Sequence, residues 1–277
     1  MEAAVAAAVF GASLLHATWH ALVKSSGDRV IALAGMNLVS GAAALALLPF
    51  VGPPTAEAAM VIAFSVLLHG AYKLALAQLY SRADLSQGYP LARGLTPIMA
   101  TLLGAAFLAE LPEGQRLAGI VTVSAGIAAL LFERGARPVS GAGFASALAV
   151  GATVAAYSVL DAYGVRVNGE WLGFTAWLIA CDSALFVLYA LLSRGGAAMR
   201  TWREHWPRTL ASGSLGLASF GVFMWALGRA QVGPVTALRE TSIVFAAIIG
   251  AVFLRESVAR MRYLAAAIVM AGTVLIL

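Results

Sequence analysis

The sequence predicts an all-α membrane protein of ten transmembrane helices, arranged as two inverted five-helix repeats. Three observations predict this fold: the composition, a regular succession of apolar segments, and a similarity between the two halves of the chain. Of the 277 residues, 61% are hydrophobic and only 11% are charged, whereas about a quarter of the residues of an average soluble domain are charged. Most of the folded surface is therefore expected to face lipid.

Ten apolar segments have about the length of ~20 residues that a helix needs to cross ~30 Å of hydrocarbon. Turn-forming residues separate them, among them Gly52-Pro53-Pro54 and Gly233-Pro234. The fourth segment holds Pro90 and Pro97, and backbone freed by proline is tolerated at membrane depth only inside protein or beside a water-filled cavity. The predicted spans are residues 3–23, 30–50, 58–79, 86–109, 115–132, 141–163, 171–192, 207–229, 233–254 and 258–277.

The two halves of the chain resemble each other at a spacing of 146 residues. Over residues 93–131, twelve of 39 positions match without a gap, including Arg93 with Arg239 and Glu110 with Glu256. An Ala- and Gly-rich composition does not readily pair arginine and glutamate in register, so these matches indicate an internal repeat.

The repeat divides the chain into two five-helix domains, residues 1–134 and 139–277. An odd number of spans inverts the second copy relative to the first. Inverted repeats are typical of secondary transporters, in which the solute site lies near the midplane between the halves. The repeat therefore predicts a transporter that works by alternating access.

A family resemblance lies in the same segments. Pro97, Phe107-Leu108-Ala109-Glu110, Gly119 and Gly126, repeated in part as Phe253-Leu254-Arg255-Glu256 and Gly272, resemble the signature of the EamA domain of the drug/metabolite transporter superfamily. The second copy departs from the signature at Ile243 and Ala265, where proline and glycine are usual. The resemblance implies a ten-helix transporter. It is weak for the substrate, because the family is similar to exporters of amino acids, drugs and metabolites and to exchangers of sugar conjugates.

Charged side chains within the apolar segments are expensive to place in a membrane, so they indicate a functional site. Six lie there, three of each sign, which permits mutual pairing: Lys73, Arg93, Asp161, Asp182, Arg239 and Glu240. Polar and aromatic residues share helix faces at i, i+3 and i+4 spacing. The predicted cavity residues are His16, Trp19, His20, His69, Tyr72, Lys73, Tyr89, Arg93, Tyr157, Asp161, Arg239 and Glu240.

Several solutes are compatible with these residues. Arginine or lysine could hold a carboxylate, and aspartate or aromatic faces could hold an ammonium group, which favours export of amino acids or similar small metabolites. An exchanger of phosphorylated or nucleotide-linked sugars would need more cations at this depth, and a multidrug exporter would use a buried acid such as Asp161 or Glu240. A membrane-embedded enzyme would need a nucleophile with a base, or a metal cluster, so no enzyme and no catalytic residue is predicted.

The sequence predicts neither a metal nor a cofactor. His16 and His20 are spaced as two zinc ligands, but no third ligand follows on their helix. Histidines that bond to a neighbouring helix or line the cavity are the alternatives. No phosphate-binding glycine loop ending in Gly-Lys-Ser/Thr occurs. Basic residues are spread between apolar segments without forming a stripe, so nucleic acid is not an expected partner.

The expected location is the inner, cytoplasmic membrane, crossed many times. Two fused halves complete the pseudo-dimer, so a monomer could function alone. One side of the predicted topology holds twelve Lys and Arg residues and the other holds Arg116, Arg166 and Arg229. The positive-inside rule puts the richer side in the cytoplasm and both termini outside, whereas the family resemblance implies termini inside. We favour the charge count.

Overall fold

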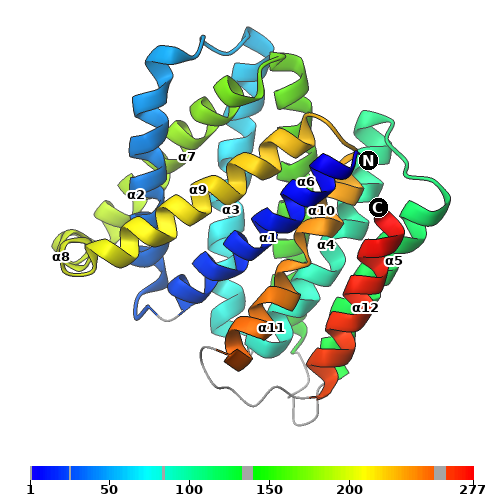
Figure 1. Cartoon of the computed structure of the whole chain (residues 1–277). Coiled ribbons are helices and arrows are strands. Elements are labelled where there is room, and N and C mark those ends of the chain that lie inside the picture. Colours follow the sequence, from blue (N-terminus) through cyan, green and yellow to red (C-terminus); the bar gives the residue numbers. More distant parts are fainter. Residues whose placement is uncertain (1, 25, 83–84, 133–139, 253–259) are drawn as a thin grey trace.

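The chain is all-α in the part that the computed structural model describes, residues 2–24, 26–82, 85–132, 140–252 and 260–277. The helices and the two short 3-10 turns pack side by side, and both termini lie at the same end of the bundle (Figure 1). The elements are α1 (Ala3–Lys24), α2 (Arg29–Leu47), η1 (Leu48–Phe50), α3 (Ala56–Arg82), α4 (Leu85–Leu108), α5 (Gly114–Ala128), η2 (Ala129–Phe132), α6 (Gly141–Asn168), α7 (Trp171–Arg194), α8 (Gly196–Glu204), α9 (Trp206–Leu227), α10 (Val232–Arg239), α11 (Ser242–Val252) and α12 (Arg260–Ile276).

Eight helices of the described part are long and apolar enough to cross a membrane: α1 to α7, with α2 and α5 extended by their 3-10 turns, and α9. The predicted count of ten is therefore not confirmed. The predicted ninth span is divided into α10 and α11, of 8 and 11 residues. The tenth corresponds to α12, of which 17 residues are described.

The division between α10 and α11 is a local change of hydrogen bonding. The N–H groups of Glu240 and Thr241 bond to the carbonyls three residues earlier, at 3.1 Å each, instead of four. This tightens the chain into a 3-10-like turn. The carbonyl of Leu238, which accepts the N–H of Thr241, also accepts hydrogen bonds from the hydroxyls of Thr241, at 2.7 Å, and Ser13 of α1, at 3.2 Å. The fourth span, where prolines favoured such an interruption, is one continuous helix through Pro90 and Pro97.

Glycine allows two helices, α5 and α12, to approach each other closely. α5 packs against α12 along its length (Figure 1). A Cβ atom added at Gly119 would lie 2.7 Å from the carbonyl oxygen of Gly272, and one added at Gly272 would lie 2.7 Å from the backbone nitrogen of Val123. Small residues let helix backbones approach closely, which is how membrane helices gain packing energy without a hydrophobic driving force.

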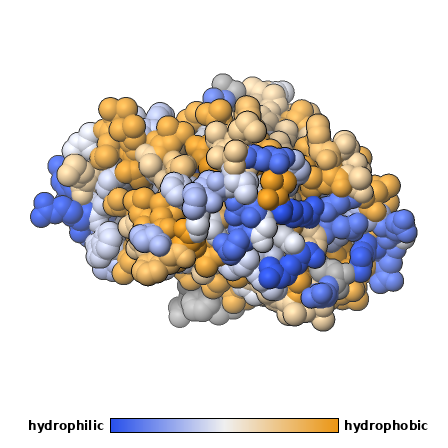
Figure 2. All heavy atoms as spheres, turned by 90° about the horizontal axis from the view of Figure 1, so that it is seen from above, coloured by the Kyte–Doolittle hydropathy of each residue, from blue (hydrophilic) through white to orange (hydrophobic). Residues whose placement is uncertain are grey.

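The outer surface is apolar where lipid is expected. Large hydrophobic side chains face outward on many helices, and Phe50, Phe107, Phe132 and Leu192 are each at least 75% exposed. Figure 2 looks onto the end of the molecule that is uppermost in Figure 1, where hydrophilic residues gather and hydrophobic residues border them. The apolar helices and this surface are those of a multi-pass membrane protein.

Candidate functional site

A cavity of about 110 Å³ lies inside the bundle, and seven helices contribute to its wall: α1, α2, α3, α6, α7, α9 and α10. Its surface combines charged, polar and aromatic side chains. A water molecule needs roughly 10–15 Å³ of such space, so the cavity has room for several waters or for a small solute.

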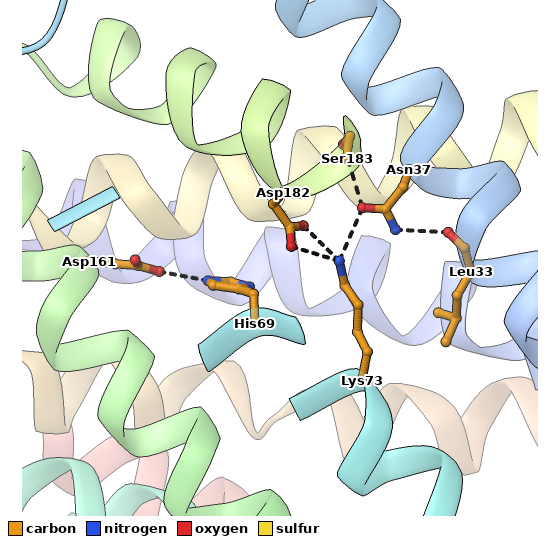
Figure 3. A network of polar contacts seen from close by, with 7 residues as sticks. All are labelled: Leu33, Asn37, His69, Lys73, Asp161, Asp182 and Ser183. Carbon is orange, nitrogen blue, oxygen red and sulfur yellow. Dashed lines mark hydrogen bonds and ion pairs between the residues drawn. The ribbon is translucent and has the colours of Figure 1, made fainter. Parts of the chain in front are cut away.

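Lys73 and Asp182 form an ion pair at the cavity wall. The Nζ atom of Lys73 on α3 lies 2.8 and 2.7 Å from the two carboxylate oxygens of Asp182 on α7. It also donates to the side-chain oxygen of Asn37 on α2 at 3.3 Å, an oxygen that Ser183 bonds at 3.4 Å (Figure 3). Both charges of this pair are satisfied, so three helices are joined by a polar network beside the cavity.

A second acid, Asp161 of α6, is fully buried and has two partners on α3. Its Oδ2 lies 3.1 Å from Nε2 of His69 (Figure 3), and its Oδ1 accepts a short hydrogen bond from Ser65. The ring of His69 stacks on Tyr157 with centroids 4.1 Å apart. His69 and Tyr157 line the cavity, while Asp161 holds His69 from behind.

Three aromatic rings of α1 form a compact group. His20 stacks on Trp19 with centroids 3.8 Å apart, and its Nε2 lies 3.1 Å from Nε2 of His16. His16 and Trp19 line the cavity. The two histidines therefore bond to each other, and no group of three His, Cys, Asp or Glu that could hold a metal occurs in the described ranges.

The two arginines of the internal repeat have different surroundings. Arg93 of α4 pairs with Glu240, with its Nε 2.7 Å from the carboxylate oxygen Oε2. Arg239 of α10 lines the cavity and is 9% exposed, with its guanidinium carbon 4.2 Å from the ring centroid of Phe223. No carboxylate lies within 4 Å of Arg239 among the described residues, and its Nε and Nη1 have no hydrogen-bond partner there.

The structure brings most of the predicted site residues together. Four of them lie in contact with a lining residue or pack just behind the wall: His20, Arg93, Asp161 and Glu240. The side chain of Tyr89 lies outside the described residues. Seven line the cavity directly: His16, Trp19, His69, Tyr72, Lys73, Tyr157 and Arg239.

Several lining residues were not among the predicted ones. Asn37 and Ser40 of α2 and Ser183 of α7 belong to the wall, as does Asp182, which the sequence marked as a membrane-depth charge without placing it in the cavity. Asn37 and Ser40 lie at i, i+3 spacing in an otherwise apolar segment, a signal that could have found them. The aromatic Phe220 gives no such signal, because aromatic residues are also common in apolar packing.

The second half of the chain matches a known family. Residues 141–277 match the model of the EamA-like transporter family. This half belongs to the EamA-like transporter family. The EamA-like half carries α10 and Arg239, and the family points to a membrane transporter rather than an enzyme, with a small solute as its substrate.

The fold of the whole chain has a counterpart among solved structures. The chain is similar to a crystal structure titled only "Crystal structure of protein", with a TM-score of 0.78 and 20% identity, over 99% of this chain and 98% of that one. At this identity the likeness concerns the fold, and it extends over the first half as well as the EamA-like half. No curated protein sequence matches the chain.

Proposed function

We propose that the protein is a secondary active or facilitative transporter that exports amino acids or similar small metabolites across the inner membrane by alternating access. The single observation that carries this proposal is the polar cavity inside an apolar bundle. Charged groups at membrane depth cost several kcal/mol each unless they are paired, and here they surround a hollow large enough for a small solute.

The size of the cavity favours a small metabolite over the alternatives. Pockets for drug-sized ligands have volumes of roughly 300–1,000 Å³, several times the 110 Å³ of this cavity. A nucleotide-linked sugar or a typical drug exceeds that space in the conformation described. Amino acids and solutes of similar size fit it better.

Helix packing supports the arrangement as two five-helix repeats, residues 1–134 and 139–277. If α1, α2, α3 and α5 correspond to α6, α7, α9 and α12, and α4 to α10 with α11, the contacts are preserved when the halves are exchanged. The pair α1–α9 then maps onto α6–α3, and α4–α6 maps onto the contacts of α1 with α10 and α11. The pairs α2–α7 and α5–α12 map onto themselves. Such exchange symmetry is what two mirror-related transport states require, and it lets a monomer form the complete site.

Counterflow in proteoliposomes tests the proposal. The purified protein is reconstituted with each of a panel of unlabelled amino acids and metabolites inside, and uptake of the same labelled solute is measured against protein-free vesicles. We expect accelerated exchange for at least one small solute and none for large drugs. An Arg229→Gln variant, altered at an exposed arginine outside the cavity, should exchange as the wild type does. Rates equal to those of protein-free vesicles for the whole panel contradict the proposal.

The basic loops support an orientation with both termini outside. In the predicted topology, twelve Lys and Arg residues belong to the side opposite the termini, and the positive-inside rule puts that side in the cytoplasm. A reporter that is active only in the cytoplasm, fused after Leu277, should stay inactive, whereas the same reporter inserted after Gly195 should be active. The reverse pattern contradicts this orientation.

A further inference from the structure

Among the described residues, Arg239 is a cation at the cavity wall with no carboxylate within 4 Å, although Glu240 is near enough to interact with it electrostatically. Lys73 pairs with Asp182, and Arg93 pairs with Glu240. Asp161 is held by His69 and Ser65. The three acids at membrane depth, Asp161, Asp182 and Glu240, thus have close partners other than Arg239. Of the six charges, whose balance permits mutual pairing, four form ion pairs with one another.

The internal repeat explains why this charge is left over. Arg93 and Arg239 occupy equivalent positions, but the residue that follows them differs: Gly94 in the first half and Glu240 in the second. The two equivalent arginines are therefore accompanied by a single glutamate. Its carboxylate makes its close ion pair with Arg93, and the guanidinium of Arg239 is turned instead to the face of Phe223 and to the cavity.

An arginine in this position calls for an anion. A guanidinium does not lose its proton in a protein. Arg239 therefore stays charged although only 9% of its surface is exposed. A buried charge needs a partner with which it forms hydrogen bonds. The aromatic ring supplies part of the compensation, but two N–H-bearing nitrogens, Nε and Nη1, lack acceptors among the described residues. These two N–H groups point to different sides of the guanidinium, and a carboxylate bound to one of its planar forks would supply acceptor oxygens to this charge.

We propose that Arg239 is the carboxylate-binding residue of the cavity, and that the transported solute is recognised by its carboxylate and not by an amino group. This inference rests on the proposed transport function and names the substrate class of the same site. The acids that could hold an ammonium group, Asp182 and Asp161, are occupied by Lys73 and His69. The solute is therefore a small organic acid, of which an amino acid is one case and its deaminated analogue another.

The rest of the wall suits the body of such an acid. Trp19, Phe220 and Leu217 add aromatic and aliphatic surface to the cavity. A carboxylate on Arg239 would leave the remainder of the solute against these side chains. A small acid with an apolar body fits this wall, whereas an amine of the same shape would bring a second uncompensated positive charge next to Arg239.

A matched series of three solutes tests the inference. Leucine, 4-methylpentanoate and 3-methylbutylamine share a branched aliphatic body and carry both groups, only the carboxylate, or only the amine. Each is assayed as a competitor of counterflow by the intact wild-type protein and as a stabiliser of the detergent-purified protein against heat. We expect both carboxylates to compete and to raise the melting temperature, and the amine to do neither. Equal action of the amine, or action of leucine alone, overturns the inference.

Substitution of the arginine gives a second readout. Charge-assisted hydrogen bonds contribute roughly 1.5–3 kcal/mol each, so Arg239→Gln should weaken competition by both carboxylates roughly ten- to a hundredfold. Arg239→Lys, which keeps the charge without the fork, should lose less, and Arg229→Gln should lose nothing. Undiminished carboxylate competition in Arg239→Gln overturns the inference.

The two proposals can fail separately. If other solutes exchange but none of the three matched compounds competes or stabilises the protein, the transport function is supported and the carboxylate site is rejected. If no solute exchanges and none stabilises the protein, both fall. Should the glutamine variant not fold, the wild-type series decides alone.

Discussion

The ion pair of Lys73 and Asp182 shows what a single residue contributes at membrane depth. The two side chains are 9% and 15% exposed and are 2.7 Å apart at their closest atoms. Removing one partner of a buried pair leaves an uncompensated charge, which costs about 3–5 kcal/mol, whereas replacing both by apolar residues is often neutral. Lys73→Met and Asp182→Leu alone should each lower the melting temperature of the purified protein strongly.

The double variant tests whether the two side chains contribute to thermal stability as a pair or independently. Lys73→Met combined with Asp182→Leu should recover most of the lost thermal stability in fluorescence-detected unfolding, while it changes the polarity of the cavity and lowers counterflow. If the double variant is no more stable than the worse single variant, the two charges do not stabilise each other.

Which residues belong to the site could be predicted at this scale, but not how they pair. Charges in apolar segments are visible in the sequence because a membrane tolerates few of them, and Lys73, Arg239 and Asp161 were found in this way. Their partners depend on the angle at which each helix is turned. Asp161 faces Ser65 and His69 of α3, and no periodicity within α6 indicates which neighbouring helix its carboxylate will meet.

At the scale of the element, the turn between α10 and α11 is contacted by a hydroxyl from another helix. The hydroxyl of Ser13 of α1 lies 3.2 Å from the carbonyl oxygen of Leu238, which also accepts the N–H of Thr241 in the turn. It lies 2.9 Å from the carbonyl oxygen of Val9 on its own helix, so its single proton is shared between the two carbonyls. A buried hydrogen bond of this kind contributes about 1 kcal/mol, so Ser13→Ala should lower the melting temperature slightly and shift the position of Arg239. Reduced counterflow at unchanged protein yield would reflect that shift.

Thr18→Ala is the matched control for this helix. Its hydroxyl bonds to the carbonyl of Leu14 within α1, at 2.8 Å, and the bond is exposed. We expect no change in stability or exchange. Equal behaviour of the two variants would mean that the bond from Ser13 does not support the turn.

The contact between α5 and α12 provides a prediction for a helix pair. An alanine at Gly272 would place its Cβ 2.7 Å from the nitrogen of Val123 and 2.8 Å from the carbonyl oxygen of Gly119, both backbone atoms that cannot turn aside. The two helices must therefore move apart, and Gly272→Ala should lower the melting temperature. Gly11→Ala, in α1 with nothing within 4 Å of the added carbon, should be neutral or slightly stabilising because alanine favours helix. A neutral Gly272→Ala contradicts the close contact.

Apolar helices could be predicted more reliably than their interruptions. Length and hydropathy located α1 to α7 and α9 to within a few residues. The short helix α8 was missed because its nine residues carry Arg200, Arg203 and Glu204 and resemble a charged loop. It is fixed by Trp202, whose indole N–H donates to the carbonyl of Ile31 at 2.8 Å, a long-range contact that no local pattern contains.

For the whole molecule, the proposed mechanism requires contacts at each end that break and form again. At the end that carries the termini, Glu110 after α4 bonds to Nη1 of Arg166 of α6 at 2.6 Å and to the backbone nitrogen of Val232 at the start of α10 at 3.0 Å. Arg166 also donates to the carbonyls of Leu227 and Ala230. One carboxylate thus joins the loop between α4 and α5, in the first proposed repeat, to two helices of the second.

If this junction closes that end of the molecule, then weakening it should open the cavity there. We expect Glu110→Gln to increase labelling of a cavity cysteine by a membrane-impermeant maleimide added at the side of the termini. The reporter is Ser40→Cys in a Cys181→Ser background, because Ser40 lines the cavity and Cys181 is the one cysteine of the chain. The neutral amide keeps the size of the side chain but loses the charge that Arg166 binds, so labelling should rise several-fold while the reagent added from the opposite side labels more slowly.

Glu113→Gln, in the same loop, should leave both rates unchanged because no hydrogen bond or ion pair of its carboxylate joins the two halves within the described residues. Equal labelling of the Glu110 and Glu113 variants would show that the junction does not control access, and the alternation of the two states would have to depend on contacts at the opposite end instead.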